Sequence, residues 1–182
     1  HKLEWIDPAE GAAGAVAEAL TTGADAEALT KALAPFTSGD AALSPAAVGE
    51  LIMRQVLEGW AAEVTDEALK SDENVLKVHG KALLAKKPLL LAMLGGESPD
   101  RLQAQLGALR SVQQLCNRLG YPFDLIKNFF YLFYDWDVVT EDGCNLWRED
   151  DADYAGKTTA LVKLNKFYEW LAEADEEEED ED

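Results

Sequence analysis

Few side chains of this 182-residue chain are placed to do chemistry. Gly156-Lys157-Thr158 resembles part of a phosphate-binding loop, in which a lysine and backbone N–H groups hold nucleotide phosphates. That loop needs another glycine five residues before Gly156, where this chain has Asp151, so we expect no nucleotide site. His79 has no Ser, Cys or Asp placed for a proton relay, and we expect a packed or surface histidine.

The two cysteines and the many carboxylates also lack the setting that catalysis requires. Cys116 and Cys144 show no metal-ligand spacing, and we interpret them as helix-packing thiols in a reducing compartment. A solvated cluster of acids offers no apolar pocket that would separate the proton affinities of two carboxylates. We therefore expect no enzyme, no metal and no cofactor.

The charge balance limits the classes of partner. With 35 acidic and 16 basic side chains the net charge is -19, which repels nucleic acid and anionic membrane surfaces. The longest apolar run, residues 88–94, is too short to span a bilayer, and no signal peptide is visible. We expect a cytoplasmic protein that binds a basic partner. Because the first residue is His1, we also expect the chain to begin inside a longer protein.

Helix signals recur along the chain and predict an all-α fold. Asp7-Pro8, Ser44-Pro45 and Ser98-Pro99 each place a capping side chain before a proline, which is typical of a helix start. No strand-like alternation interrupts the series. Short joints favour antiparallel helix pairs stacked into an α-solenoid, with a domain over residues 1–174 and an acidic tail over 175–182. Helical patterns cover residues 12–20, 25–33, 51–60, 74–86, 102–119, 123–134, 140–147 and 159–174.

Aromatic residues and acids converge in a first block, residues 129–150. Phe129, Phe133 and Trp136 recur at helical spacing with Leu132, so we expect this stripe to face a core. Thr140 is placed to cap the next helical segment, residues 140–147, and acids lie in its first turn and after its end. Helix capping alone could explain the acids of the first turn, Glu141 and Asp142.

A second block covers residues 166–182. Phe167, Trp170 and Leu171 recur at helical spacing, and nine of the last ten residues are carboxylates. An acidic run of this kind is usually a solvated, self-repelling extension. The aromatic helix that leads into it favours a binding role instead.

Together the two blocks, joined by the segment Gly-Lys-Thr-Thr-Ala-Leu, resemble the acidic-aromatic boxes of the W2 domain family of eukaryotic translation initiation factors. The resemblance covers about residues 102–182, and initiation factor 4 gamma and death-associated protein 5 are the members it resembles most. It implies a HEAT-like stack of helices whose boxes bind lysine-rich protein segments. The implied partners are the MAP-kinase-interacting kinase for factor 4 gamma and initiation factor 2 beta for factor 5.

Carried over to this chain, the resemblance assigns two sets of residues. The partner-binding acids would be Asp135, Asp137, Glu141, Asp142, Glu149, Asp150, Glu173, Asp175, Glu176, Glu177 and Glu178. The core beneath them would contain Phe129, Phe133, Trp136, Trp147, Phe167 and Trp170. Gly143-Cys144 departs from the alanine and aromatic residue expected there.

Two other functions remain open at this stage. Similarity to the epsilon subunit of factor 2B implies guanine-nucleotide exchange on initiation factor 2. A domain of this charge could also act as an acidic chaperone for histones, without selectivity among basic ligands.

Overall fold

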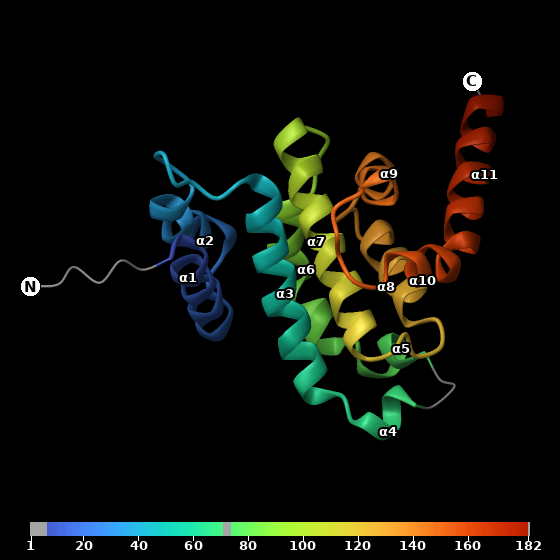
Figure 1. Cartoon of the computed structure of the whole chain (residues 1–182), viewed down its shortest axis with the longest axis horizontal. Helices are drawn as coiled ribbons and strands as arrows, with labels where there is room; N and C mark the ends of the chain where they lie inside the picture. The colour runs from blue at the N-terminus through green and yellow to red at the C-terminus, as the bar shows by residue number, and fades with distance from the viewer. Residues whose placement is uncertain (1–6, 71–73, 182) are drawn as a thin grey trace, which may run out of the picture.

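The computed structural model describes residues 7–70 and 74–181, and within these ranges it contains helices and no strand (Figure 1). The predicted all-α class is confirmed. The helices are α1 Pro8–Thr22, α2 Ala26–Leu33, the short 3-10 helix η1 Ala34–Phe36, α3 Pro45–Glu63, α4 Asp66–Leu69, α5 Val75–His79, α6 Lys81–Leu94, α7 Pro99–Arg118, α8 Leu125–Asp135, α9 Glu141–Glu149, α10 Lys157–Lys163 and α11 Asn165–Glu181.

The three predicted proline-capped helix starts are confirmed. The side chains of Asp7, Ser44 and Ser98 accept hydrogen bonds from backbone N–H groups in the first turns of α1, α3 and α7, at 3.0, 3.1 and 3.3 Å. Proline occupies the first helical position in each case, where its missing N–H leaves no partner unsatisfied. Local chemistry therefore sets these boundaries.

Two predicted helices are each divided in the structure, and α4 was not predicted. The segment 74–86 is divided at Gly80, which lies between the end of α5 and the start of α6. An added Cβ at Gly80 would overlap the carbonyl oxygen of Leu76. The segment 159–174 breaks at Leu164, between α10 and α11. Residues 175–181 of the predicted tail continue α11 as helix, and Asp182 lies outside the described residues.

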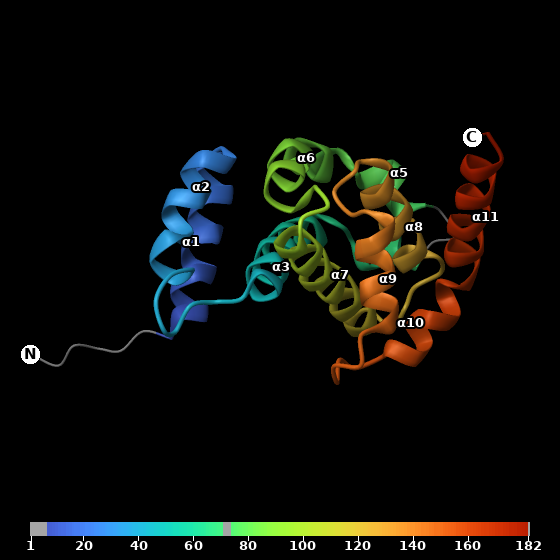
Figure 2. The same ribbon diagram turned by 90° about the horizontal axis from the view of Figure 1, so that it is seen from above.

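The helices form successive layers from one end of the molecule to the other, beginning with α1 and α2 and ending with α10 and α11 (Figure 2). The most extensive contact joins α3 and α7, which run in the same direction (Figure 1). In a stack of antiparallel helix pairs, the first helix of one pair runs parallel to the first helix of the next pair, as α3 and α7 do. Gly49 and Gly107 permit the close approach, because a Cβ on Gly49 would overlap the Ala104 carbonyl and one on Gly107 the Ala46 carbonyl.

Aromatic side chains fill the core of the second half. Phe129, Phe133, Trp147 and Phe167 are fully buried, and Trp136 is nearly so at 9% exposure. The unpredicted centre of this cluster is Phe130, which meets Trp147 and Phe167 edge to face at centroid distances of 5.0 and 5.6 Å. Edge-to-face pairs add about 0.5–1.5 kcal/mol each beyond burial.

Both cysteines lie free in this interior, and burial raises the pKa of each thiol, that of Cys144 to about 12. In the described part of the chain, no helix combines the length and apolar character needed to cross a membrane.

Candidate functional site: an acidic-aromatic groove

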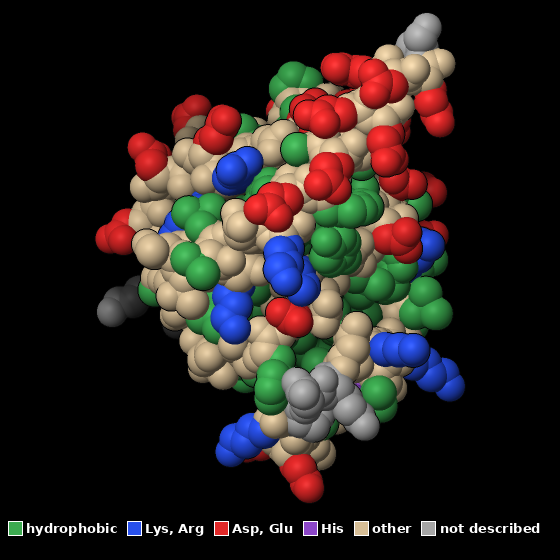
Figure 3. Space-filling model, turned by 90° about the vertical axis from the view of Figure 1, so that its right-hand side faces the viewer, with side chains coloured by type: hydrophobic (Ala, Val, Ile, Leu, Met, Phe, Trp, Pro, Cys, Tyr) green, Lys and Arg blue, Asp and Glu red, His purple; other side chains and the backbone are tan. Residues whose placement is uncertain are grey.

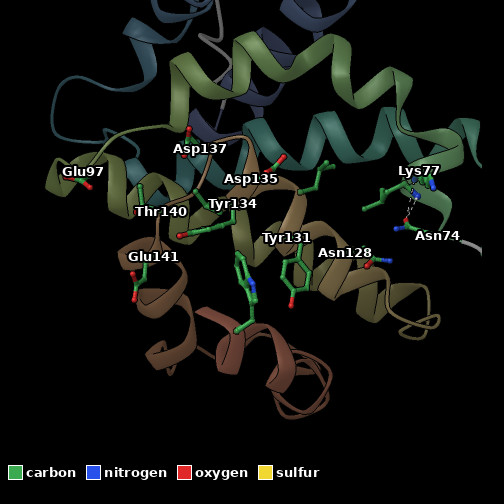
Figure 4. A pocket seen from close by; sticks show the side chains of 14 residues that line it. Asn74, Lys77, Glu97, Asn128, Tyr131, Tyr134, Asp135, Asp137, Thr140 and Glu141 are labelled. Atoms are coloured by element: carbon green, nitrogen blue, oxygen red, sulfur yellow. Dashed lines mark hydrogen bonds between the residues drawn. The ribbon is translucent and has the colours of Figure 1, made fainter. Parts of the chain in front are cut away.

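An open groove of about 810 Å³ lies between α8, the start of α9, α11 and α5. Glu97, Asp137 and Glu141 lie toward one end, Asn74, Lys77 and Asn128 toward the other, and Tyr131 and Tyr134 between them (Figure 4). Leu76, Leu132, Asp135, Val139, Thr140 and Trp170 complete the lining. The groove thus has an acidic end and a mixed amide and lysine end. Sequence analysis did not find the contributions of Glu97 or of α5.

Trp170 is the exposed aromatic surface of this groove, which corrects its predicted place in the core. Its side chain is 39% exposed. The ring packs edge to face on Tyr131 and Tyr134, with centroids 5.1 and 5.5 Å apart. Phe167, three residues earlier on the same helix, takes the buried position instead. Trp170 therefore leaves part of its indole ring exposed to solvent while two tyrosine rings support it.

The end of α8 and the turn that follows present Asp135 and Asp137. The Asp137 backbone has φ of 60°, a left-handed conformation in which Asp and Asn are tolerated better than other non-glycine residues. The Asp137 N–H donates to the Tyr134 carbonyl and the Val138 N–H to the Phe133 carbonyl, both at 3.0 Å. This pattern ends the helix. Asp135 and Asp137 are both exposed, so their carboxylates remain available.

The start of α9 is held in place by Gln105, a fully buried residue of α7. Its side-chain oxygen accepts hydrogen bonds from the N–H and the hydroxyl of Thr140, each at 2.9 Å. Its side-chain amide donates to the carbonyls of Leu94 and Gly96 at 2.9 and 2.8 Å. Gln105 thereby fixes the position from which Glu141 enters the groove, a role that sequence analysis missed.

Gln105 also explains the glycine that departs from the family pattern. A Cβ on Gly143 would overlap the Gln105 side-chain oxygen and lie 3.0 Å from the Gln105 Cβ. The space expected for an alanine at this position is therefore filled by the glutamine from α7.

Glu141 lies against the acidic part of α11. Burial raises the pKa of Glu141 to about 7, and a hydrogen bond to Asp175 and the charges of Asp175, Asp142 and Glu178 act in the same direction. The pKa of Tyr134 is also raised, first by burial and then by Glu141, Glu178 and Asp175. When two carboxyl groups such as those of Glu141 and Asp175 are in contact, repulsion between their negative charges favours the form in which they share one proton.

The five acids of α11 that were predicted to bind a partner divide into two rows. Asp175 and Glu178 follow Leu171, the last buried residue of the helix, at i+4 and i+7, and they face Glu141 and Tyr134. Glu173, Glu176 and Glu177 point away from that side by their helical positions, and they are exposed, as is Glu178. Figure 3 shows carboxylates along the projecting helix α11 beside an apolar surface. We call Asp175 and Glu178 the inner row, and Glu173, Glu176 and Glu177 the outer row.

Asp150 is not available to a partner, which corrects its predicted role. Both of its oxygens accept hydrogen bonds from Arg110 at 2.9 Å, and its side chain is only 12% exposed. The hydrogen bond from Arg110 is the main cause of a lowered Asp150 pKa. Asp142 and Glu149 are exposed on α9 but do not line the groove.

The Gly156-Lys157-Thr158 segment starts α10, and its lysine is committed to internal contacts. Lys157 Nζ lies 3.9 Å from the centroid of the Trp147 ring and donates to the carbonyls of Trp147 and Asp150. Burial lowers the Lys157 pKa. Residues 7–70 and 74–181 contain no group of His, Cys, Asp and Glu side chains that could hold a metal ion.

The groove elements α8, α9 and α11 lie within a family match. Residues 104–181 match the model described as W2: eIF4-gamma/eIF5/eIF2-epsilon. These residues belong to the W2 family. The chain is 34% identical over 126 residues to eukaryotic translation initiation factor 4 gamma 3 of Mus musculus, covering 68% of this chain and 8% of that protein.

Two further relatives agree with this assignment. Eukaryotic translation initiation factor 4 gamma 1 of Mus musculus is 36% identical over 123 residues, 66% of this chain and 7% of that protein. Factor 4 gamma 2 of Homo sapiens is 29% identical over 139 residues, 72% of this chain and 15% of that protein. The chain thus spans less than a sixth of the length of these relatives.

Proposed function

We propose that this W2 region is a recruitment domain of translation initiation, and that its groove binds a lysine-rich segment of another protein. The domain would act by binding rather than by catalysis. The observation that supports the proposal is the half-exposed Trp170, held by Tyr131 and Tyr134 beside the exposed carboxylates of Asp135 and Asp137.

This arrangement suits lysine because the side chain has an apolar stem and a cationic end. The stem can cover the aromatic rings while the ammonium reaches the carboxylates, and an ammonium over an indole face gains about 0.5–2 kcal/mol. The groove is formed by packed helices, so the domain need not fold when the partner binds. Segments of a MAP-kinase-interacting kinase and of initiation factor 2 beta are the candidate ligands.

The test compares two exposed aromatic residues. Trp170→Ala removes the ring in the groove, whereas Phe123→Ala removes a 47% exposed ring outside its lining. Lysine-rich peptides from the two candidate partners are titrated into each variant, with circular dichroism as the check on folding. We expect Trp170→Ala to weaken binding about 5- to 30-fold, for a loss of about 1–2 kcal/mol, and Phe123→Ala to leave it unchanged.

Equal affinities for the two variants would contradict the groove as the binding site. Two further measurements separate the other functions. We expect the domain to leave the rate of nucleotide release from initiation factor 2 unchanged. A faster release would favour exchange activity instead. Binding of histone tails with the same affinity as the candidate segments would favour an unselective acidic chaperone.

A further inference from the structure

Helix α6 carries an apolar surface that no described helix covers. Its exposed residues are five apolar ones and a single charged one: Lys81, Leu84, Ala85, Pro88, Leu91 and Ala92. Leu84 and Leu91 are 55% and 40% exposed, although many other leucines of the chain are buried. In Figure 2, α6 lies at the edge of the molecule with no helix drawn outside it.

These exposed residues form one continuous face. At 100° per residue, positions 81, 84, 85, 88, 91 and 92 fall within a third of the helix circumference, and the buried Leu83, Leu90 and Leu94 lie on the opposite side. We call the exposed set the α6 face. A helix that is apolar on both sides is normally covered on both sides. The α6 face therefore has the character of a contact surface.

The chain segment that carries the α6 face is basic, in contrast to the rest of the sequence. Between Asn74 and Gly96 the chain has Lys77, Lys81, Lys86 and Lys87 and no Asp or Glu, although it contains 35 acids in all. Lys77 and Lys81 are exposed, and Lys87 lies with its ammonium 5.6 Å from the Trp136 ring centroid. Lys86 is directed inward and donates to the Leu20 carbonyl at 3.1 Å.

We propose that the α6 face binds an amphipathic helix with acidic flanks from another protein. A leucine-bearing helix face would pack on Leu84, Pro88 and Leu91, and its carboxylates would meet Lys81, the one charged residue of the α6 face. Charge decides among the occupants. A second copy of α6 would bring the same lysines and no carboxylate, and α11 offers acids beyond Leu171 but little apolar surface. The net charge of -19 opposes an anionic membrane.

The test uses two fluorescein-labelled 18-residue peptides with the whole 182-residue chain. One has leucine and alanine on one helical face and glutamate on its flanks, and the other has lysine at every glutamate position. The variants are Leu84→Glu and Lys81→Glu, with Val162→Glu as the control because Val162 is apolar, 72% exposed and on α10. All are surface changes, and circular dichroism verifies the fold.

We expect the glutamate peptide to bind, with affinity lowered at least 10-fold by Leu84→Glu, about 3- to 10-fold by Lys81→Glu, and unchanged by Val162→Glu. Trp170→Ala should leave binding of the glutamate peptide unchanged. Binding of the lysine peptide should be weakened by Trp170→Ala and left unchanged by Leu84→Glu. Failure of the groove proposal is thereby distinguished from failure of this one. No binding of the glutamate peptide, or equal losses in Leu84→Glu and Val162→Glu, overturns the proposal.

A second measurement reports contact at the α6 face directly. Because Cys116 and Cys144 are fully buried, a polarity-sensitive fluorophore on Leu84→Cys or Val162→Cys should label the introduced thiol alone. The glutamate peptide should shift the emission to the blue at position 84 and not at 162. A concentration-dependent dimer that Leu84→Glu abolishes would overturn the proposal, because the occupant would then be a second copy of the chain. Binding to phosphatidylserine vesicles that Leu84→Glu abolishes would overturn it as well.

Discussion

The two ends of this molecule are packed in different ways. In the second half, large rings fill the interior, with Phe130 enclosed by Trp147 and Phe167. In the first layer, helices α1 and α2 bury only small or aliphatic side chains, namely Ala12, Val16, Ala19, Leu29 and Leu33. Free energy from burial scales with apolar area, so the first layer gains less per residue.

The polar contacts repeat this difference. Lys86 Nζ to the Leu20 carbonyl, at 3.1 Å, and Thr30 Oγ1 to Met93 Sδ, at 3.7 Å, join the first layer to α6. In the second half, Gln105 and Gln113 are buried and each bonds to two separate segments. The groove therefore lies on the rigid half. The first layer is the part from which we expect local opening at the lowest free energy.

The largest expected effect is on the aromatic core. Phe130→Ala leaves a cavity between Trp147 and Phe167 and should cost about 3–5 kcal/mol, lowering the melting temperature by about 10 °C. The matched change in the first layer is Phe36→Ala, at a half-buried ring, which should cost clearly less. Thermal melts by circular dichroism measure both. Equal losses would contradict the difference between the two regions.

A somewhat smaller effect is expected at the contact between α3 and α7. In Gly107→Ala the new methyl meets the Ala46 carbonyl and the Glu50 backbone N–H, neither of which can rotate away. Overpacking of this kind costs about 1–3 kcal/mol. Gly59→Ala in α3, where nothing lies within 4 Å of an added Cβ, should be neutral or stabilising. Urea titration of both variants tests the glycine contact.

A change in the first layer should act locally. Leu29→Ala removes a fully buried side chain of α2, and hydrogen exchange should accelerate at α1 and α2. The near-ultraviolet signal of the aromatic core should melt within about 2 °C of the parent protein. A cooperative fall of that signal as well would show that the two regions unfold as one unit.

Local signals explain what sequence analysis predicted well. Ser44 and Ser98 cap helices within their own first turns, and Phe129 and Phe133 occupy one stripe of a single helix. Such features depend on neighbours a few residues away. The prediction for Trp170 failed because helical spacing cannot say where a stripe ends at the edge of a core.

The groove depends on contacts between residues far apart in the sequence, and helical spacing along one segment cannot predict such contacts. Asp150 is neutralised by Arg110, 40 residues earlier, and Thr140 is held by Gln105, 35 residues earlier. The lining from α5 joins α8 across more than 50 residues of sequence. The breaks at Gly80 and Leu164 were also missed, since helical periodicity continues through both positions.

The smallest expected effect concerns the charge of Glu141 in the groove. Burial and Asp175 raise its pKa to about 7 in the folded protein, against about 4.3 in an unfolded chain. A raised pKa means that the neutral form stabilises the fold, fully below about pH 4 and progressively less as the pH rises to 7. Glu141→Gln keeps that neutral form, so the variant should be more stable than the parent at pH 8 and equal to it at about pH 4. Partial solvent screening reduces the difference to about 1 kcal/mol, or about 2–4 °C in melting temperature.

Glu173→Gln is the control for this change, because Glu173 belongs to the outer row and is not among the groups that act on Glu141. The same proton links stability to binding. A lysine-rich peptide that fills the groove at pH 7 should displace the proton of Glu141, and calorimetry in buffers of different ionisation enthalpy should detect its release. In Glu141→Gln the release should disappear. Release that persists in this variant, or a melting temperature that does not differ from the parent at pH 8, would contradict the coupling between α9 and α11.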